Sequence, residues 1–172
     1  RCSQAKEKSE FEQYLCYMVS NSRNIGFLLN ALNGGGAEKM VLNLAAEFSE
    51  QGNDVCLIVT SNTGEYTDQI PPDVQVVDLN AHRQLAALPS LIYHLRKSSY
   101  DAVPSTGTGM NIIACIAKYI SHIDAPLTIR VQTTMSEAIT NYYRPEHRFF
   151  PIAVKATFPL ADRIIAISDG VA

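Results

Sequence analysis

NIGFLLNALNGGGAEKMVLNLAAEFSEQGNDVCLIVT, residues 24–60, predicts a strand, a helix and a second strand. The apolar runs 25–29 and 55–60 are typical of strands buried on both faces of a parallel sheet. Gly52 stands just after the helical stretch, where glycine commonly ends a helix. Between the strands, apolar side chains recur at helical spacing: Ala37, Met40, Val41, Leu44, Ala45 and Phe48.

The alternation of strands and helices continues to the end of the sequence. Further strands are predicted over residues 74–79, 102–105, 127–132 and 163–168. Helices are predicted from Pro89 through Leu95, over 109–120, and over 146–160, the last interrupted by Pro151 and Pro159. Pro104 is awkward within its strand because proline offers no ladder donor. The pattern predicts an α/β fold, a Rossmann-like open parallel sheet with helices on both faces.

The predicted domain covers residues 24–172. Residues 1–23 are polar, lack clean periodicity and are interpreted as a loosely attached extension. At the other end, Ser168 is placed to cap a helix that four more residues cannot complete, so we expect the sequence to be a fragment.

Composition excludes several classes of protein. The formal net charge is -3 over 172 residues, which gives no bulk attraction to nucleic acid. No run of about 20 apolar residues predicts a transmembrane helix, and the polar N-terminus does not resemble a signal peptide. Neither the cysteines nor the histidines have metal-binding spacing, so no metal site is predicted. Cys56 and Cys115 lie in apolar runs as buried thiols, which fits a reducing cytoplasm.

The triple glycine Gly34-Gly35-Gly36 is the first candidate site. It follows a predicted strand and precedes a helix, where ligands bind in open parallel sheets and where helix N-termini attract anions. The alternative interpretation is a flexible turn. Lys39 occupies the third glycine position of a dinucleotide fingerprint, and no P-loop motif occurs, so oxidoreductases and nucleoside triphosphatases are poorly supported. In the following turn, Glu38 complements the helix dipole, while Lys39 either reaches an anionic ligand or is solvated.

Two more polar segments are expected at the same edge of the sheet. In the loop 105–111, Asn111 is placed to hydrogen-bond an acceptor, although a capping role for Thr108 or Asn111 is an equal alternative. After the strand 127–132, Thr133 offers a hydroxyl to a sugar or caps the next helix.

Two stretches resemble the family-4 glycosyltransferases. GGGAEKMVLNLA, residues 34–45, is similar to the start of their first helix, and ADRIIAISDGVA, residues 161–172, is similar to the end of their N-terminal domain. The segment 100–103 and the pair Thr108 and Asn111 add to the resemblance, which spans about residues 24–172.

The resemblance implies the N-terminal half of a GT-B fold, in which two Rossmann-like domains face each other. The N-terminal domain mostly holds the acceptor, and the C-terminal domain, absent from these residues, mostly binds the nucleotide sugar. The glycine loop of relatives approaches the donor diphosphate or the acceptor. Many relatives also carry a polar residue at the positions of Arg130 and Gln132, although a role that needs imidazole does not transfer to Gln132. The alternative for Arg130 is a salt-bridged charge at a strand end.

The implied activity is retaining transfer of a hexose from a nucleotide-sugar donor to a glycan or lipid-linked acceptor. No resident metal or other cofactor is implied, and no catalytic residue can be assigned. The aromatic and basic segment 142–148 predicts contact with a membrane surface or a lipid-linked acceptor, consistent with a cytoplasmic or peripheral location. The alternatives are a non-catalytic glycan- or nucleotide-binding module and part of a GT-B sugar-nucleotide epimerase.

Overall fold

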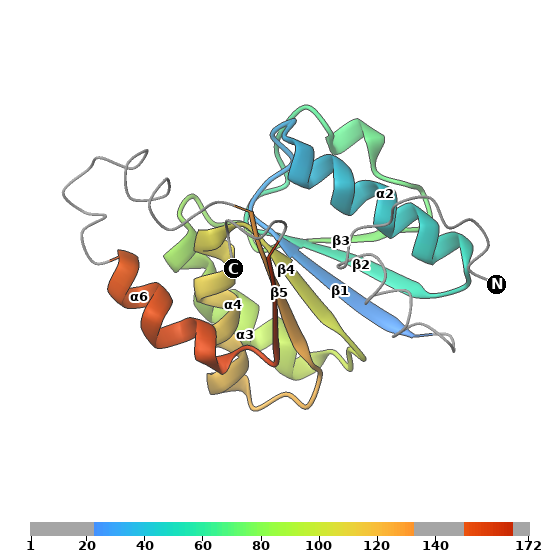
Figure 1. Ribbon diagram of the computed structural model, residues 1–172. Coiled ribbons are helices and arrows are strands. Elements are labelled where there is room, and N and C mark those ends of the chain that lie inside the picture. Colours follow the sequence, from blue (N-terminus) through green and yellow to red (C-terminus); the bar gives the residue numbers. More distant parts are fainter. Residues whose placement is uncertain (1–22, 133–149, 167–172) are drawn as a thin grey trace.

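The computed structural model describes residues 23–132 and 150–166. Its centre is a six-stranded sheet in the order β3-β2-β1-β4-β5-β6, in which every described pair of neighbouring strands is parallel (Figure 1). The strands are β1 (Asn24–Leu29), β2 (Asp54–Val59), β3 (Gln75–Asp78), β4 (Val103–Thr106), β5 (Leu127–Val131) and β6 (Arg163–Ala166). The predicted parallel sheet is confirmed.

Helices cover both faces of the sheet, also as predicted. On one face lies α2 (Gly36–Glu50), and on the other lie α3 (Leu88–Lys97), α4 (Thr108–Ser121) and α6 (Phe150–Thr157) (Figure 1). Three short 3₁₀ helices complete the described elements: η1 (Thr67–Gln69), η2 (Gln84–Ala87) and η4 (Phe158–Leu160).

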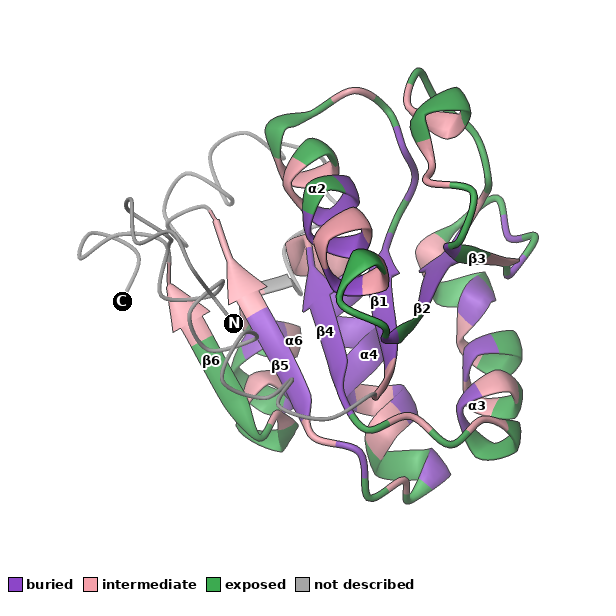
Figure 2. Ribbon diagram, turned by 90° about the vertical axis from the view of Figure 1, so that its right-hand side faces the viewer, coloured by how far each residue is buried: buried purple, intermediate pink, exposed green. Residues whose placement is uncertain are grey.

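Alternation along the strands divides the core into two apolar clusters. Leu28 and Ile58 belong to the cluster beneath α3 and α4, whereas Phe27 and Leu57 belong to the cluster beneath α2. Successive strand residues point to opposite faces, so a strand buried on both sides is apolar throughout. Figure 2 shows this burial in the central strands and a more exposed β6 at the edge. The buried thiols predicted for Cys56 and Cys115 are confirmed, and burial raises the pKa of both, that of Cys115 to about 11.

The prolines refine the predicted boundaries. Pro89 lies in the first turn of α3, as expected. Pro151 does not interrupt a helix, because it lies in the first turn of α6, where its missing N–H has no partner to lose. Pro159 does change the conformation, since α6 gives way there to η4. The predicted segments 146–149 and 167–168 lie outside the described residues.

Pro104 lies within an interior strand, where its missing N–H faces β1. The carbonyl of Ala102 accepts a hydrogen bond from Gly26 at the start of β1, whereas the N–H of Val103 donates to Pro126 beside β5. Because backbone groups alternate in direction, Pro104 faces the same strand as Ala102. The β4–β5 ladder therefore keeps four register pairs, while β1 and β4 share one pair and an isolated bridge.

Asp162, part of the family-like ending, joins three elements at the amino-terminal edge of the sheet. Its Oδ2 accepts a hydrogen bond from the N–H of Leu127 at 2.6 Å and pairs with the ammonium of Lys118 from the last turn of α4. Its own N–H donates to the carbonyl of Leu127. Burial alone would raise the pKa of Asp162, but the hydrogen bonds from Lys118 and Leu127 outweigh it, so the pKa falls below the usual value of a carboxyl group.

We expect Asp162→Asn to lower the melting temperature by about 2 °C near neutral pH, a small effect because the pair is partly solvent-screened. A depressed pKa stabilises the fold above the ordinary carboxyl value and loses that contribution as pH falls through the folded value. The difference between wild type and variant should therefore shrink below about pH 4. Thermal melts across this range test it, with the exposed Asp124→Asn as control. A difference in melting temperature between wild type and variant that persists at acid pH would contradict the prediction.

Among residues 23–132 and 150–166, no helix has the length and hydropathy of a transmembrane span.

Candidate functional site

The order of the strands reverses between β1 and β4. The chain proceeds outward through β2 and β3 on one side and through β5 and β6 on the other. In open parallel sheets, the loops at the carboxyl ends of the strands flanking such a reversal are the usual place for a ligand. The loop 30–35 follows β1 and the turn at Gly107 follows β4, so both lie at this edge. Arg130 lies one residue before the end of β5, so Gly35 and Arg130 share the edge, as predicted.

The glycine loop uses its three glycines differently. Gly34 has φ of +95°, a conformation that disfavours side chains. Gly35 is the N-cap of α2 with φ of −82° and ψ of 163°, which any residue adopts. Gly36 opens the helix, with no heavy atom within 4 Å of where a Cβ would stand. Gly34 is therefore the position of the three that requires glycine. The N-terminus of α2 has no side-chain cap.

The segment 61–70 braces this loop from the side of β2. Backbone hydrogen bonds join Leu32 N–H to Thr63 and Tyr66 N–H to Leu32, both at 3.0 Å. Gly64, with φ of +125°, lies so close to the carbonyl of Leu32 that a side chain would collide with backbone. Such backbone contacts hold the glycine loop in one position.

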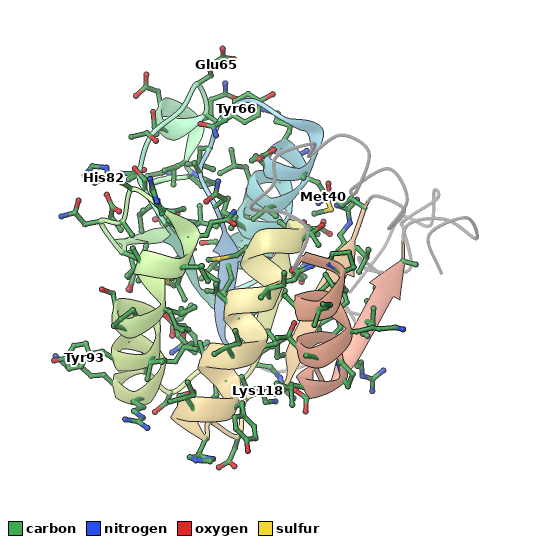
Figure 3. All side chains as sticks on the ribbon, turned by 90° about the vertical axis from the view of Figure 1, so that its left-hand side faces the viewer. Met40, Glu65, Tyr66, His82, Tyr93 and Lys118 are labelled. Carbon is green, nitrogen blue, oxygen red and sulfur yellow. The ribbon has the colours of Figure 1, made fainter. Side chains whose placement is uncertain are left out.

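Two carboxylates flank the glycines. A methyl group on Gly34 would lie 2.7 Å from Oε2 of Glu65, and one on Gly35 would collide with the carboxylate of Glu38. Figure 3 places Glu65 and Tyr66 at one end of the molecule and Lys118 at the other. Carboxylates accept hydrogen bonds from hydroxyl groups and repel phosphate, so the loop favours a polyhydroxylated ligand.

Lys39 is directed at η1. Its ammonium donates to Oε1 of Gln69 at 2.7 Å and lies 5.3 Å from the centre of the Tyr66 ring. These contacts support the segment that braces the glycine loop. The role in anion binding considered for Lys39 would require this arrangement to change.

The second candidate loop turns sharply from β4 into α4. Gly107 has φ of +90° and is the N-cap of α4, so Thr108 is the first helical residue and caps nothing. Asn111 is completely buried, and its amide bonds to Ser105 and to the carbonyl of Arg130. It therefore neither caps α4 nor faces solvent for an acceptor. At Gly109, the side chain of Gln84 packs where a Cβ would stand.

The third candidate segment places polar side chains on the face of the sheet that carries α2. Ser105 faces α4, to which it is bonded, so alternation turns Thr106 to the α2 face. Gln132 donates to the hydroxyl of Thr106 and lies on the same face, as does Arg130 two residues earlier. Arg130 and Gln132 are both half-buried. A cation, an amide and a hydroxyl thus share the face and the edge of the glycine loop.

Two residues of this edge were not predicted from the sequence, and two were predicted only as part of a loop. Ser105 and Thr106 belong to the predicted loop 105–111, but neither was given a role of its own. Glu65 and Gln84 had no signal, because their proximity to glycines arises from tertiary packing. Thr133 and the segment 142–148 lie outside the described residues, so their predicted roles stay predictions.

Two surface hollows are not lined by the glycine loop. One of about 470 Å³ lies between β3 and α3, lined in part by Asp78 and Tyr93. The other, of about 330 Å³, is at the amino-terminal edge, where Tyr100 hydrogen-bonds Nε2 of His94 at 2.7 Å. Within residues 23–132 and 150–166, no three His, Cys, Asp or Glu side chains are grouped to hold a metal ion.

Comparison of the sequence with protein families supplies the assignment. Residues 34–172 match the family described as Glycosyltransferase Family 4. The chain belongs to this family. The match begins at Gly34 and includes the glycine loop, α2, and both strand ends that carry Thr106 and Arg130. No curated protein sequence matches the chain.

Solved structures similar to this family-4 chain share its fold. Anabaena Alr3699/HepE, crystallised with UDP and glucose, is 19% identical with a TM-score of 0.59, covering 87% of this chain and 39% of that one. MurG of Acinetobacter baumannii is 16% identical with a TM-score of 0.56, covering 87% and 42%. A putative UDP-N-acetylglucosamine 2-epimerase of Listeria monocytogenes is 14% identical with a TM-score of 0.57, covering 88% and 40%. The chain thus spans about two fifths of these structures.

Proposed function

We propose that this chain is the acceptor-binding half of a retaining glycosyltransferase that moves a hexose from a nucleotide-sugar donor to an acceptor hydroxyl. In this reaction, the bond between the anomeric carbon and the diphosphate breaks, and a bond from that carbon to the acceptor oxygen forms. The hydroxyl proton is released and the nucleoside diphosphate departs. The proposal extends to a donor domain outside these residues and to catalysis without a resident metal.

The proposal rests on the polar side chains at the carboxyl edge of the sheet, in a chain that belongs to Glycosyltransferase Family 4. The carboxylates of Glu38 and Glu65 flank backbone that a ligand can approach closely, which suits sugar hydroxyls. Arg130 lies on the same face and edge, where a cation stabilises charge that develops on a departing diphosphate. Positioning of the two substrates supplies much of the rate enhancement in such transfers.

The test uses the full-length protein with UDP-glucose, UDP-galactose and UDP-N-acetylglucosamine, each with and without a panel of glycan and lipid-linked acceptors. We expect UDP release that depends on an acceptor and persists in EDTA, with an α-linked product from an α-linked donor. The isolated residues 1–172 should transfer no sugar. Acceptor-independent conversion of UDP-N-acetylglucosamine would instead indicate an epimerase, and binding without turnover would indicate a binding module. Robust transfer by residues 1–172 alone would contradict the proposal that the nucleotide sugar is bound by a domain outside these residues.

A further inference from the structure

Asn111 is completely buried in the first turn of α4, and both polar atoms of its side chain form hydrogen bonds. Its Oδ1 accepts the hydroxyl proton of Ser105 at 2.8 Å, and its Nδ2 donates to the carbonyl oxygen of Arg130 at 3.0 Å. Its own N–H donates to the carbonyl of Gly107 at 2.8 Å. One side chain thus connects the end of β4, the turn into α4 and the end of β5.

The place of these bonds explains why an amide is needed. β4 ends at Thr106, which is the register partner of Arg130, and the chain then turns away into α4. The carbonyl of Arg130 therefore lies at the point where β4 ends and the chain turns into α4. The Nδ2 of Asn111 supplies a donor at that point, so β5 keeps its direction beyond the end of its neighbour.

A second bond holds the same strand end from the opposite face. Gln132 donates to the hydroxyl of Thr106 on the α2 side of the sheet, whereas Asn111 acts from the α4 side. Of these two bonds, only the one from Asn111 joins a completely buried side chain to a backbone carbonyl. Removing Nδ2 would leave a carbonyl without its interior donor, which is more costly than losing a solvent-exposed bond.

We infer that Asn111 is a positioning residue that holds the carboxyl end of β5, and with it Arg130 and Gln132, at a fixed place relative to the glycine turn at Gly107. The catalytic part of this inference rests on the proposed function. The geometric part does not, because it concerns only the backbone of β5.

Asn53 provides a matched control. It is also buried, its Oδ1 accepts from the N–H of Arg23 at 3.1 Å, and its Nδ2 donates to the carbonyl of Phe48 at 2.8 Å. It lies between α2 and β2 at the opposite edge of the sheet. Asn53→Asp and Asn111→Asp therefore replace the same donor by an oxygen that repels a carbonyl, at two buried positions that lie at different ends of the fold.

Hydrogen exchange of the full-length wild type and both variants tests the geometric part. We expect Asn111→Asp to accelerate exchange in residues 129–132 by about tenfold or more, and Asn53→Asp to leave that segment unchanged at a comparable melting temperature. If Asn111→Asp does not fold, Asn111→Ser removes the same donor without adding charge. Unchanged exchange in residues 129–132, or equal acceleration by the Asn53 variant, would overturn the inference.

Kinetics with the UDP-sugar and acceptor pair that the wild type uses test the catalytic part. Misplacement of reacting groups lowers kcat steeply, so Asn111→Asp should lower kcat about 10- to 100-fold and change KM by less than about twofold. Asn53→Asp should leave both within about twofold. Equal losses in the two variants would assign Asn111 a purely structural role. A wild type that releases no UDP from any donor counts against the proposed function. The hydrogen-exchange comparison still decides whether Asn111 holds the carboxyl end of β5.

Discussion

Gly35→Val in the full-length enzyme should lower kcat/KM for transfer by about 100-fold while the fold persists. Gly35 has extended φ and ψ that valine adopts, and the nearest obstacle is the flexible end of Glu38. The loss of glycine at an N-cap costs about 1 kcal/mol, or about 3 °C in melting temperature. The added side chain would keep an acceptor oxygen from the backbone between Gly34 and Gly36, which is why the effect on transfer is large.

Two variants separate a blocked site from a damaged fold. Asn43→Val places valine at an exposed position further along α2 and should leave transfer unchanged. Gly34→Val should instead destabilise the protein by about 1–3 kcal/mol, because Gly34 has positive φ. Normal transfer by the Gly35→Val protein would show that the triple glycine is only a turn. The site would then centre on Arg130 and the loop 106–111.

Arg130→Ala should lower transfer by about 100-fold, the loss typical when a group that stabilises transition-state charge is removed. Arg130 lies near the carboxyl end of β5 on the face of α2, beside the bonded pair Thr106 and Gln132. Arg130→Lys keeps the charge but loses the planar fork, so we expect it to recover part of the activity. Steady-state kinetics of both variants, with melting temperatures, provide the measurement.

Arg163→Ala is the control for the loss of a strand arginine. Arg163 lies at the amino-terminal end of the neighbouring strand β6, far along the strand from the carboxyl edge. Its loss should change stability without changing transfer. If Arg130→Ala were as active as Arg163→Ala, Arg130 would be a structural charge at a strand end, the alternative that the sequence also allowed.

Much of the fold follows from local patterns in the sequence. Continuous apolar runs such as 25–29 and 55–60 are typical of strands covered on both faces, and they occur where β1 and β2 lie. The helical spacing between them and the glycine at position 52 predicted α2 and its end, where Gly52 has φ of +84°. These features depend on neighbours within about one turn or one strand, so the sequence alone expresses them.

The partners of the polar residues were decided only by tertiary structure. The sequence offered Asn111 as a ligand contact or a cap, but the structure buries it, because its amide meets a strand that begins far along the chain, at Leu127. Glu65 approaches Gly34 across more than 30 residues, through a loop whose sequence carries no motif. Local patterns specify which residues form a strand or helix, whereas the pairing of side chains depends on the strand order β3-β2-β1-β4-β5-β6, which brings distant segments to one edge.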